Sequence, residues 1–289
     1  LTKTWWEQLF GAARLPATLF PSIVPPGTHW GALKAAIAAE AKLEDVRVIA
    51  SCSNEMAAAF AGLPVGANEN WAFIRSGSRT LIGTELRTPI INDAARESFF
   101  SNQIGHANSV IFHKEITGLK VMEQCEQLWK ERGDPDIERN ILIHFAGESQ
   151  PFESLVDLTD PRFLTPGDMP LKIQEFCRET GQAVPRKPGP IIRCILESLA
   201  LVYRNALHEM ESLTGRKITR RYVLDGQEIN LLIHFTANAV QLPLVIVPPG
   251  SAAVGNMISQ SLAHGHLKSH EEAREVFKNS IKTKTIAPH

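Results

Sequence analysis

The apolar positions of this chain follow two different periods. From about Pro190 to Thr214 they recur every three or four residues, and Gly215 ends the run, which predicts one long helix. Short runs of β-branched and aromatic residues predict strands, which lie at 46–50, 71–75, 80–86, 221–224 and 244–247. Strands that alternate with helices indicate a layered α/β domain, in which binding sites form at the turns after the strands.

Local signals add detail to this α/β pattern. Asp168 and Pro170 suit the start of a helix over 169–180, because a carboxylate caps free amides and proline fits the first turn. The sequence Ser-Gly-Ser at 76–78 predicts a hairpin turn between two strands, and residues 109–113 are expected to add an edge strand. The remaining helices are expected at 4–13, 56–61, 118–130, 231–240, from Ser251 onward, and from a capping-box-like start at Ser269 to about Ile281.

A proline-rich stretch separates the first predicted helix from the first strand. Pro16, Pro21, Pro25 and Pro26 are typical of a connector, and we therefore expect a domain boundary near residue 44. The chain begins with Leu1 rather than Met, from which we expect it to be part of something longer.

Composition restricts the class of protein. Of the 289 residues, 44% are hydrophobic and 21% are charged, which excludes a disordered chain, a collagen and a coiled coil. The formal net charge of -1 gives no reason to expect nucleic acid or a membrane surface as a partner, and no apolar run approaches the roughly 18 residues of a spanning helix. Four cysteines without a C-x-x-C pair, and ten scattered histidines, predict no metal site and favour a reducing cytoplasm.

Several segments carry a resemblance to a known family. They read DPRFLTPGDMP at 160–170, FCRETGQ at 176–182, RCILESLAL at 193–201, INDAAR at 91–96 and LFPSIVPPG at 19–27. In these segments the chain resembles the FGGY carbohydrate kinases and, within them, the rhamnulokinases. The resemblance spans almost the whole chain but only part of the length of such kinases.

This resemblance implies an α/β fold of the actin-like ATPase (ribonuclease H-like) type, with a mixed sheet flanked by helices. Residues 1–44 would then be the tail of the N-terminal kinase lobe and the connector between lobes. Residues 45–289 would be the C-terminal, nucleotide-binding lobe, slightly truncated at its end. The missing N-terminal lobe would be the partner of this chain, and apolar surface is expected where that lobe would pack.

The implied activity is the transfer of the γ-phosphoryl group of ATP to the primary hydroxyl of L-rhamnulose, or of a related ketose, in cytoplasmic rhamnose catabolism. Magnesium would accompany the ATP, and a carboxylate would accept the proton of the hydroxyl. The family carries this carboxylate in a Ser-His-Asp-Thr stretch, which corresponds to residues 53–56. Glu55 keeps the carboxylate with one more methylene, so it is expected to be a detuned catalytic base. The resemblance places substrate-binding positions at Asn54, Glu55, Met56 and Glu115. The alternative is that Glu55 is only an exposed polar residue at the start of a helix, where a negative charge is favourable.

The positions that bind the nucleotide in the family are only partly kept in this sequence. Ser76, Gly77 and Ser78 match the hairpin that faces the phosphates in the family. Glu123 stands at another polar position of the nucleotide site, and of a Gly-rich turn that corresponds to residues 224–229 only Gly226 is kept. A Gly-Asn pair at 255–256 is also kept, and we interpret it as a helix-packing feature.

Scaffold segments thus match the family well, whereas most positions that would touch sugar, proton or nucleotide differ. Two hypotheses of different class follow: a lobe of a sugar kinase, or a non-catalytic, pseudokinase-like relative that binds sugar, nucleotide or a protein partner. A third is a decayed or truncated gene product without activity. A single lobe cannot close a cleft around both substrates, so the chain alone is expected to lack turnover.

Overall fold

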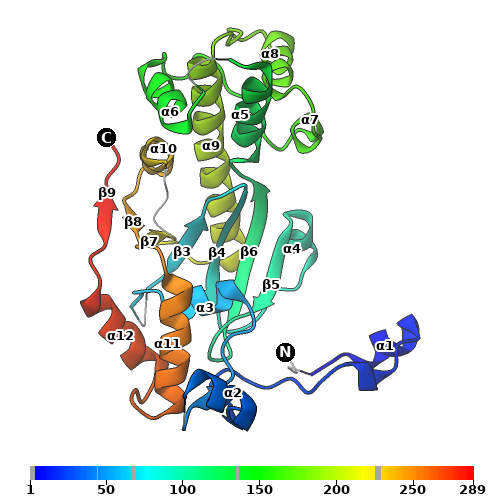
Figure 1. Cartoon of the computed structure of the whole chain (residues 1–289). Helices are drawn as coiled ribbons and strands as arrows, with labels where there is room; N and C mark the ends of the chain where they lie inside the picture. The colour runs from blue at the N-terminus through cyan, green and yellow to red at the C-terminus, as the bar shows by residue number, and fades with distance from the viewer. Residues whose placement is uncertain (1–3, 44, 67–68, 135–136, 225–228) are drawn as a thin grey trace.

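The centre of the protein is a mixed β-sheet. The computed structural model describes residues 1–289 except 1–3, 44, 67–68, 135–136 and 225–228 (Figure 1). Within the described residues the sheet has seven strands in the order β5-β6-β4-β3-β7-β8-β9, and β3, β7 and β8 run parallel. The strands are β3 (Trp71–Arg75), β4 (Arg79–Leu86), β5 (Phe100–Ile104), β6 (Val110–Thr117), β7 (Arg220–Val223), β8 (Leu244–Ile246) and β9 (Lys284–Ile286).

The predicted edge strand at 109–113 is wrong in its position. β6 lies inside the sheet, because it pairs with β4 on one side and with β5 on the other. The strand beyond it is β5, which the sequence analysis missed. β5 reads FSNQI, and its three consecutive polar residues give no apolar pattern from which a strand could be recognised.

Helices cover both faces of the sheet. Ala72 and Ile74 of β3 face the long helix α9 (Pro188–Thr214), while Trp71 and Phe73 pack with α3 (Glu55–Ala61) on the other face. α11 (Ser251–Ala263) packs on α3 (Figure 1). The other helices are α1 (Glu7–Ala13), η1 (Ala17–Leu19), α2 (Ala35–Ala41), α4 (Asp93–Glu97), α5 (Lys120–Arg132), α6 (Arg139–Glu148), α7 (Pro161–Leu164), α8 (Met169–Glu179), α10 (Asn230–Val240) and α12 (His270–Ser280).

The predicted helix caps are confirmed. The Asp168 carboxylate accepts a hydrogen bond from the Leu171 amide at 3.0 Å, and the Ser269 hydroxyl accepts one from the Glu272 amide at 3.1 Å. The long helix ends as predicted, because Gly215 adopts a left-handed conformation with φ of 63°. None of the helices in the described parts of the chain is long and apolar enough to cross a membrane.

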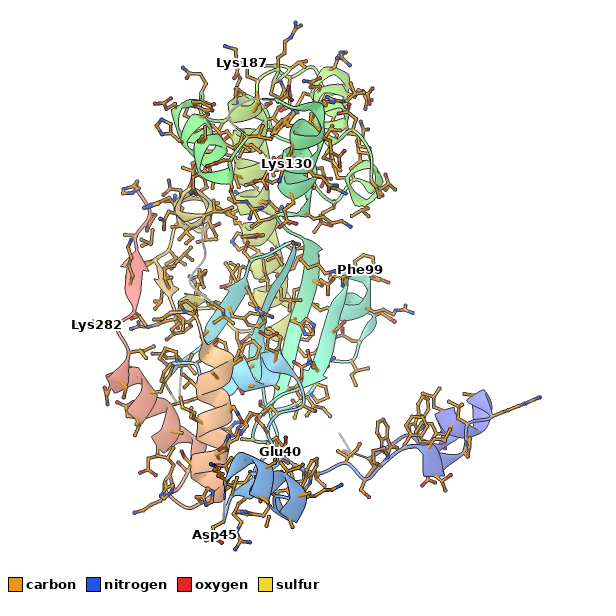
Figure 2. The ribbon with its side chains drawn as sticks, viewed as in Figure 1. Glu40, Asp45, Phe99, Lys130, Lys187 and Lys282 are labelled. Atoms are coloured by element: carbon orange, nitrogen blue, oxygen red, sulfur yellow. The ribbon has the colours of Figure 1, made fainter. Side chains whose placement is uncertain are left out.

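The molecule is elongated. Helices α5 to α8 gather at one end, where Lys130 and Lys187 lie, and Glu40 and Asp45 mark the opposite end (Figure 2). At that opposite end β1 (His29–Ala32) pairs antiparallel with β2 (Arg47–Ile49), across the boundary expected near residue 44. Cys177 and Cys194 are buried free thiols in the helical end.

The N-terminal segment stands away from this body (Figure 1). Phe10 and Phe20 stack on each other with ring centroids 4.1 Å apart, and Trp5 packs against both. This segment exposes several large hydrophobic residues. Its exposed large hydrophobic residues, together with those of the β1–β2 unit, are Trp5, Trp6, Leu9, Leu15, Leu19, Ile23, Trp30, Ile37, Leu43 and Val46.

Candidate active site

The candidate site lies at the edge of the sheet where the parallel strands end. Because β3, β7 and β8 are parallel, the turns after Arg75, Val223 and Ile246 leave the sheet at the same edge. Ligands of open α/β sheets bind outside the carboxyl ends of the strands. β6 also runs parallel to β3, since each pairs antiparallel with β4, so the β6–α5 junction lies at this edge as well.

Glu55 reaches this edge from the first turn of α3. Its Oε1 atom accepts a hydrogen bond from Nη2 of Arg75, the last residue of β3, at 2.8 Å. The Glu55 side chain is 66% exposed, and its Oε2 atom has no partner among the residues that the structure describes. A carboxylate with one free oxygen therefore lies directly beside the turn that follows β3.

Asn54 and Met56, the neighbours of Glu55, have structural roles. Asn54 is the N-cap of α3, and its Oδ1 atom accepts from the amides of Met56 at 2.8 Å and Ala57 at 3.3 Å. Met56 is 7% exposed and belongs to the core between α3 and the sheet. Of these two predicted substrate positions, only the Asn54 amide nitrogen is left to meet a sugar hydroxyl.

The turn after β3 presents amide donors. The carbonyls of Gly77 and Ser78 are occupied, because they accept from the amides of Leu119 at 2.7 Å and Gly118 at 3.2 Å. The amides of Gly77 and Ser78, in contrast, donate to no residue in the described part of the chain. A turn with its carbonyls turned inward and its N–H groups free suits an anion such as a phosphate.

Gly118 makes this arrangement possible. A Cβ atom at this position would lie 2.2 Å from the carbonyl oxygen of Gly77 and 2.4 Å from Oγ1 of Thr80. Only glycine therefore allows the β6–α5 junction to approach the turn closely enough for the two backbone hydrogen bonds.

Two further predicted residues also lie at this edge. The Ser78 hydroxyl donates to both carboxylate oxygens of Glu123, at 2.8 and 2.6 Å, and Glu115 pairs with Arg79 at 3.1 Å. Glu123 thus lies beside the amides that would face a phosphate. Its negative charge opposes a bare phosphate there, since two anions about 4 Å apart repel by a few kcal/mol near a protein surface.

The glycine-rich turn of the family is not reproduced at Leu224. This side chain is 1% exposed and lies in the core, and its amide donates to the Ile74 carbonyl at 3.0 Å. The predicted Gly226 lies outside the described residues.

The part of the chain that the structure describes contains no preformed cluster of metal ligands. Among the described residues no group of three or more His, Cys, Asp or Glu side chains could hold an ion. At the turn after β3, the carboxylate of Glu123 lies beside the hydroxyl of Ser78. Magnesium needs only one or two protein carboxylates when phosphate oxygens and water fill its other positions, so Glu123 fits a nucleotide-borne ion.

A cleft of about 780 Å³ lies at the opposite edge of the sheet. It is lined by residues from the start of β3, the end of β4, the β5–β6 turn and α12, and it contains none of the predicted site residues. This cleft and the predicted chemistry are therefore separate.

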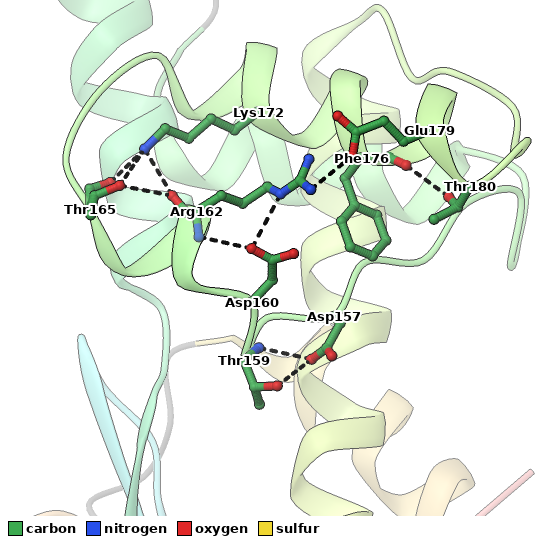
Figure 3. Close-up of polar contacts among 9 residues, drawn as sticks. All are labelled: Asp157, Thr159, Asp160, Arg162, Thr165, Lys172, Phe176, Glu179 and Thr180. Atoms are coloured by element: carbon green, nitrogen blue, oxygen red, sulfur yellow. Dashed lines mark hydrogen bonds and ion pairs between the residues drawn. The ribbon is translucent and has the colours of Figure 1, made fainter.

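Two of the segments that carry the resemblance, 160–170 and 176–182, form a scaffold on and around α7 and α8 (Figure 3). Asp160 caps α7 by accepting from the Arg162 amide at 2.9 Å, and it also pairs with the Arg162 guanidinium at 3.3 Å. The same guanidinium pairs with Glu179 at 2.8 Å and lies over the Phe176 ring, 5.2 Å from its centroid. Packing and helix capping are therefore sufficient to explain why these residues are present.

Sequence reasoning missed two residues of this edge. Arg75 directly precedes the Ser-Gly-Ser turn, and a charge at the end of a buried strand was a usable signal. Tyr203 belongs to the apolar face of α9, so the pattern gave no reason to single it out. Its hydroxyl lies 2.8 Å from Oγ of Ser76.

Comparison with known proteins agrees with this fold. The family model "FGGY family of carbohydrate kinases, C-terminal domain" matches residues 72–264. The rhamnulokinase of Enterococcus faecalis is 34% identical over 98% of this chain and 57% of its own length. The rhamnulokinase of Bacillus subtilis is 32% identical over 97% of this chain and 57% of its own length. The chain thus spans somewhat more than half of these curated relatives.

Solved structures of sugar kinases share the fold. Gluconate kinase from Lactobacillus acidophilus matches with a TM-score of 0.76 at 14% identity, over 100% of this chain and 57% of that protein. Xylulose kinase from Rhodospirillum rubrum matches with a TM-score of 0.72 at 18% identity, over 99% of this chain and 56% of that protein. The expected α/β fold of the actin-like ATPase type is confirmed.

Proposed function

The chain belongs to the FGGY family of carbohydrate kinases, and from this membership we propose that it is the nucleotide-facing lobe of a rhamnulokinase-type enzyme. The reaction would transfer the γ-phosphoryl group of ATP to the primary hydroxyl of L-rhamnulose. The curated relatives described above, both rhamnulokinases, support this choice of substrate.

The observation that carries the proposal is the meeting of Glu55 with the turn after β3. Through its contact with Arg75, the carboxylate lies beside a turn whose Gly77 and Ser78 amides donate to no internal partner among the described residues. In the proposed mechanism Oε2 of Glu55 accepts the proton of the sugar hydroxyl. The amides of the turn hold the phosphate oxygens, where charge accumulates during transfer.

Magnesium would enter with the nucleotide and offset the charge of its phosphates. The residue of this chain placed to contact it is Glu123, which the Ser78 hydroxyl orients. Asn54 would contribute its amide nitrogen to the sugar, and Glu115 would act through its pair with Arg79.

A division of labour between two lobes is part of the proposal. Residues 1–44 would belong to the N-terminal lobe and the connector, and residues 45–289 to the C-terminal lobe. The exposed apolar residues of the N-terminal segment support this division, since they need a partner surface. Reading the source DNA upstream of Leu1 tests it: an in-frame lobe supports the division, and a stop codon contradicts it.

A non-catalytic role is the second candidate. It is favoured by the fact that Glu55, Glu115 and Glu123 are each already bonded within the chain, to Arg75, Arg79 and Ser78 respectively. A site whose charges satisfy one another is stable without substrate. Such a chain would bind sugar or nucleotide without transferring phosphate.

One experiment separates these functions. We expect the isolated chain to bind Mg·ATP in a calorimetric titration at millimolar nucleotide, and to show no phosphorylation of L-rhamnulose in a coupled assay. Turnover is expected only when the chain is joined to the N-terminal lobe, because closure around both substrates needs two lobes. Absence of binding at millimolar ATP would remove the nucleotide role, and a joined protein that binds but never turns over would favour the non-catalytic function.

Replacing the Glu123 carboxylate tests the phosphate site directly. We expect Glu123→Gln to strengthen binding of Mg-free ATP about fivefold to tenfold, because a negative charge next to the turn is lost. The titration is made in a chelator and repeated with magnesium, where the gain should shrink. Glu131→Gln, an exposed residue of the same helix, is the control. Equal ATP affinities of the two variants would show that phosphates do not lie beside Glu123.

A further inference from the structure

The hydroxyl of Tyr203 joins the two ends of the candidate phosphate turn. It lies 2.8 Å from Oγ of Ser76, just before the turn, and 2.9 Å from Oγ1 of Thr80, just after it. Tyr203 is 1% exposed and Thr80 is 0% exposed, so these hydroxyls have little access to water. Burial also raises the pKa of Tyr203, which keeps the phenol protonated and able to donate.

A buried tyrosine needs one hydrogen-bond partner, and either hydroxyl alone would satisfy it. Here both ends of one turn meet at the same oxygen atom. A phenol can donate to one hydroxyl and accept from the other, so the three groups form a continuous chain of hydrogen bonds. This arrangement fixes the separation of Ser76 and Thr80 rather than merely satisfying Tyr203.

The turn is therefore held from two sides. On one side the amides of Gly118 and Leu119 bind its carbonyls, and the bond to the Gly77 carbonyl directs the Ser78 amide of the same planar peptide group to the opposite side. On the other side Tyr203 holds its ends to α9, the longest helix of the described residues. Loss of the hydrogen bonds to Tyr203 would let the turn rotate, although no group of the turn itself has been changed.

We propose that Tyr203 is a positioning residue, which keeps the amides of Gly77 and Ser78 aimed at the phosphates of the nucleotide without touching the nucleotide itself. This inference rests on the proposed nucleotide binding. It assigns a role in the site to a residue of the helix behind the sheet, far from the turn in sequence.

The chain contains two tyrosines, which provides a matched control. Tyr222 is 3% exposed, and its hydroxyl donates to Oε2 of Glu69 at 2.9 Å, away from the turn. Tyr203→Phe and Tyr222→Phe each remove one buried hydroxyl. Both variants should lose some thermal stability, but only Tyr203→Phe should disturb the turn.

The first readout needs no nucleotide. Hydrogen exchange of the Leu119 amide reports its bond to the Gly77 carbonyl, and we expect Tyr203→Phe to accelerate this exchange about tenfold relative to Tyr222→Phe. The second readout is the affinity for Mg·ATP by calorimetry. We expect Tyr203→Phe to weaken it about tenfold, equivalent to the loss of one hydrogen bond, and Tyr222→Phe to leave it unchanged.

Fluorotyrosine labelling adds a direct signal, because the two tyrosines give two ¹⁹F resonances that the Phe variants assign. Mg·ATP should shift the resonance of Tyr203 and leave that of Tyr222 in place. If Tyr203→Phe matches Tyr222→Phe in both Leu119 exchange and Mg·ATP affinity, the inference is overturned. If the parent chain binds no Mg·ATP, the proposed function fails, and the exchange of Leu119 alone decides whether Tyr203 holds the turn.

Discussion

A single methyl group at position 255 is expected to cost the protein at least about 3 kcal/mol of unfolding free energy, the upper end of the usual cost of overpacking. A Cβ atom on Gly255 would lie 1.7 Å from the carbonyl oxygen of Ala58 and 2.6 Å from its carbonyl carbon. These are backbone atoms of α3, so no side chain can rotate away. Gly255→Ala must therefore push α11 off α3.

The same contact is tight in the other direction. A Cβ atom on Gly62, the residue after α3, would lie 2.4 Å from the carbonyl oxygen of Ser251. The two helices thus meet backbone to backbone at two places. Because α3 also carries Glu55 in its first turn, Gly255→Ala should displace the proposed catalytic base as well as destabilise the fold.

Gly147→Ala is the control for this prediction. Gly147 lies inside α6, and a Cβ atom there meets nothing within 4 Å. Alanine at this site should raise the unfolding free energy by about 0.5–1 kcal/mol, because alanine has a higher helix propensity than glycine. Urea unfolding of the two variants measures the difference. If Gly255→Ala is as stable as Gly147→Ala, α3 and α11 are not in the contact that the structure shows.

The kept Gly-Asn pair at 255–256 illustrates what the sequence could predict. Its interpretation as a helix-packing feature is confirmed by the contact of Gly255 with Ala58. The long helix and the β3–β4 hairpin were predicted from pattern alone, because each has a strong period and a clear stop signal. Strand β9, in contrast, has three residues and shows no period that could reveal it.

The candidate site was predictable only in part. The resemblance singled out Glu55 and the turn at 76–78, and the topology brings them to one edge of the sheet. Their partners could not be predicted, because each contact depends on side chains from separate elements. Arg75 lies 20 residues from Glu55, and Tyr203 lies 127 residues from Ser76. Contacts between residues so far apart in sequence depend on how the whole domain packs, not on the local sequence.

The protein should also lose stability steeply in mild acid because of a stacked pair of histidines whose ring nitrogens are buried. His106, in the β5–β6 turn, and His270, the first residue of α12, stack with ring centroids 4.4 Å apart. Nδ1 of His106 and both ring nitrogens of His270 are buried without a hydrogen-bond partner in the described part of the chain. Desolvation, aided by the positive charge of Arg274, lowers the pKa of His270 to about 3 and also lowers that of His106.

The direction of the pH effect follows from these pKa values. In the unfolded chain a histidine titrates near pH 6.5, whereas His270 in the folded protein titrates at about 3. The unfolded state therefore binds the proton first, so stability is complete above about pH 6.5 and falls as the pH decreases toward 3. Each such group removes up to about 1.4 kcal/mol per pH unit within this window. Two carboxylates lie close to the pair and oppose this lowering: Glu85, held by Arg274 at 2.7 Å, raises the pKa of His106, and Glu271 raises that of His270.

His270→Gln should flatten this acid response, because glutamine cannot take up the proton. Unfolding free energies of the parent and the variant, measured in urea from pH 7.5 to 4.5, should converge or cross as the pH falls. His144→Gln removes a histidine of α6 whose side chain is 67% exposed, and it should leave the acid response as steep as in the parent. Carboxylates that titrate in the same range act equally in all three proteins, so the difference isolates the buried pair. An acid response of His270→Gln as steep as that of His144→Gln would mean that His270 does not stay neutral in the folded protein.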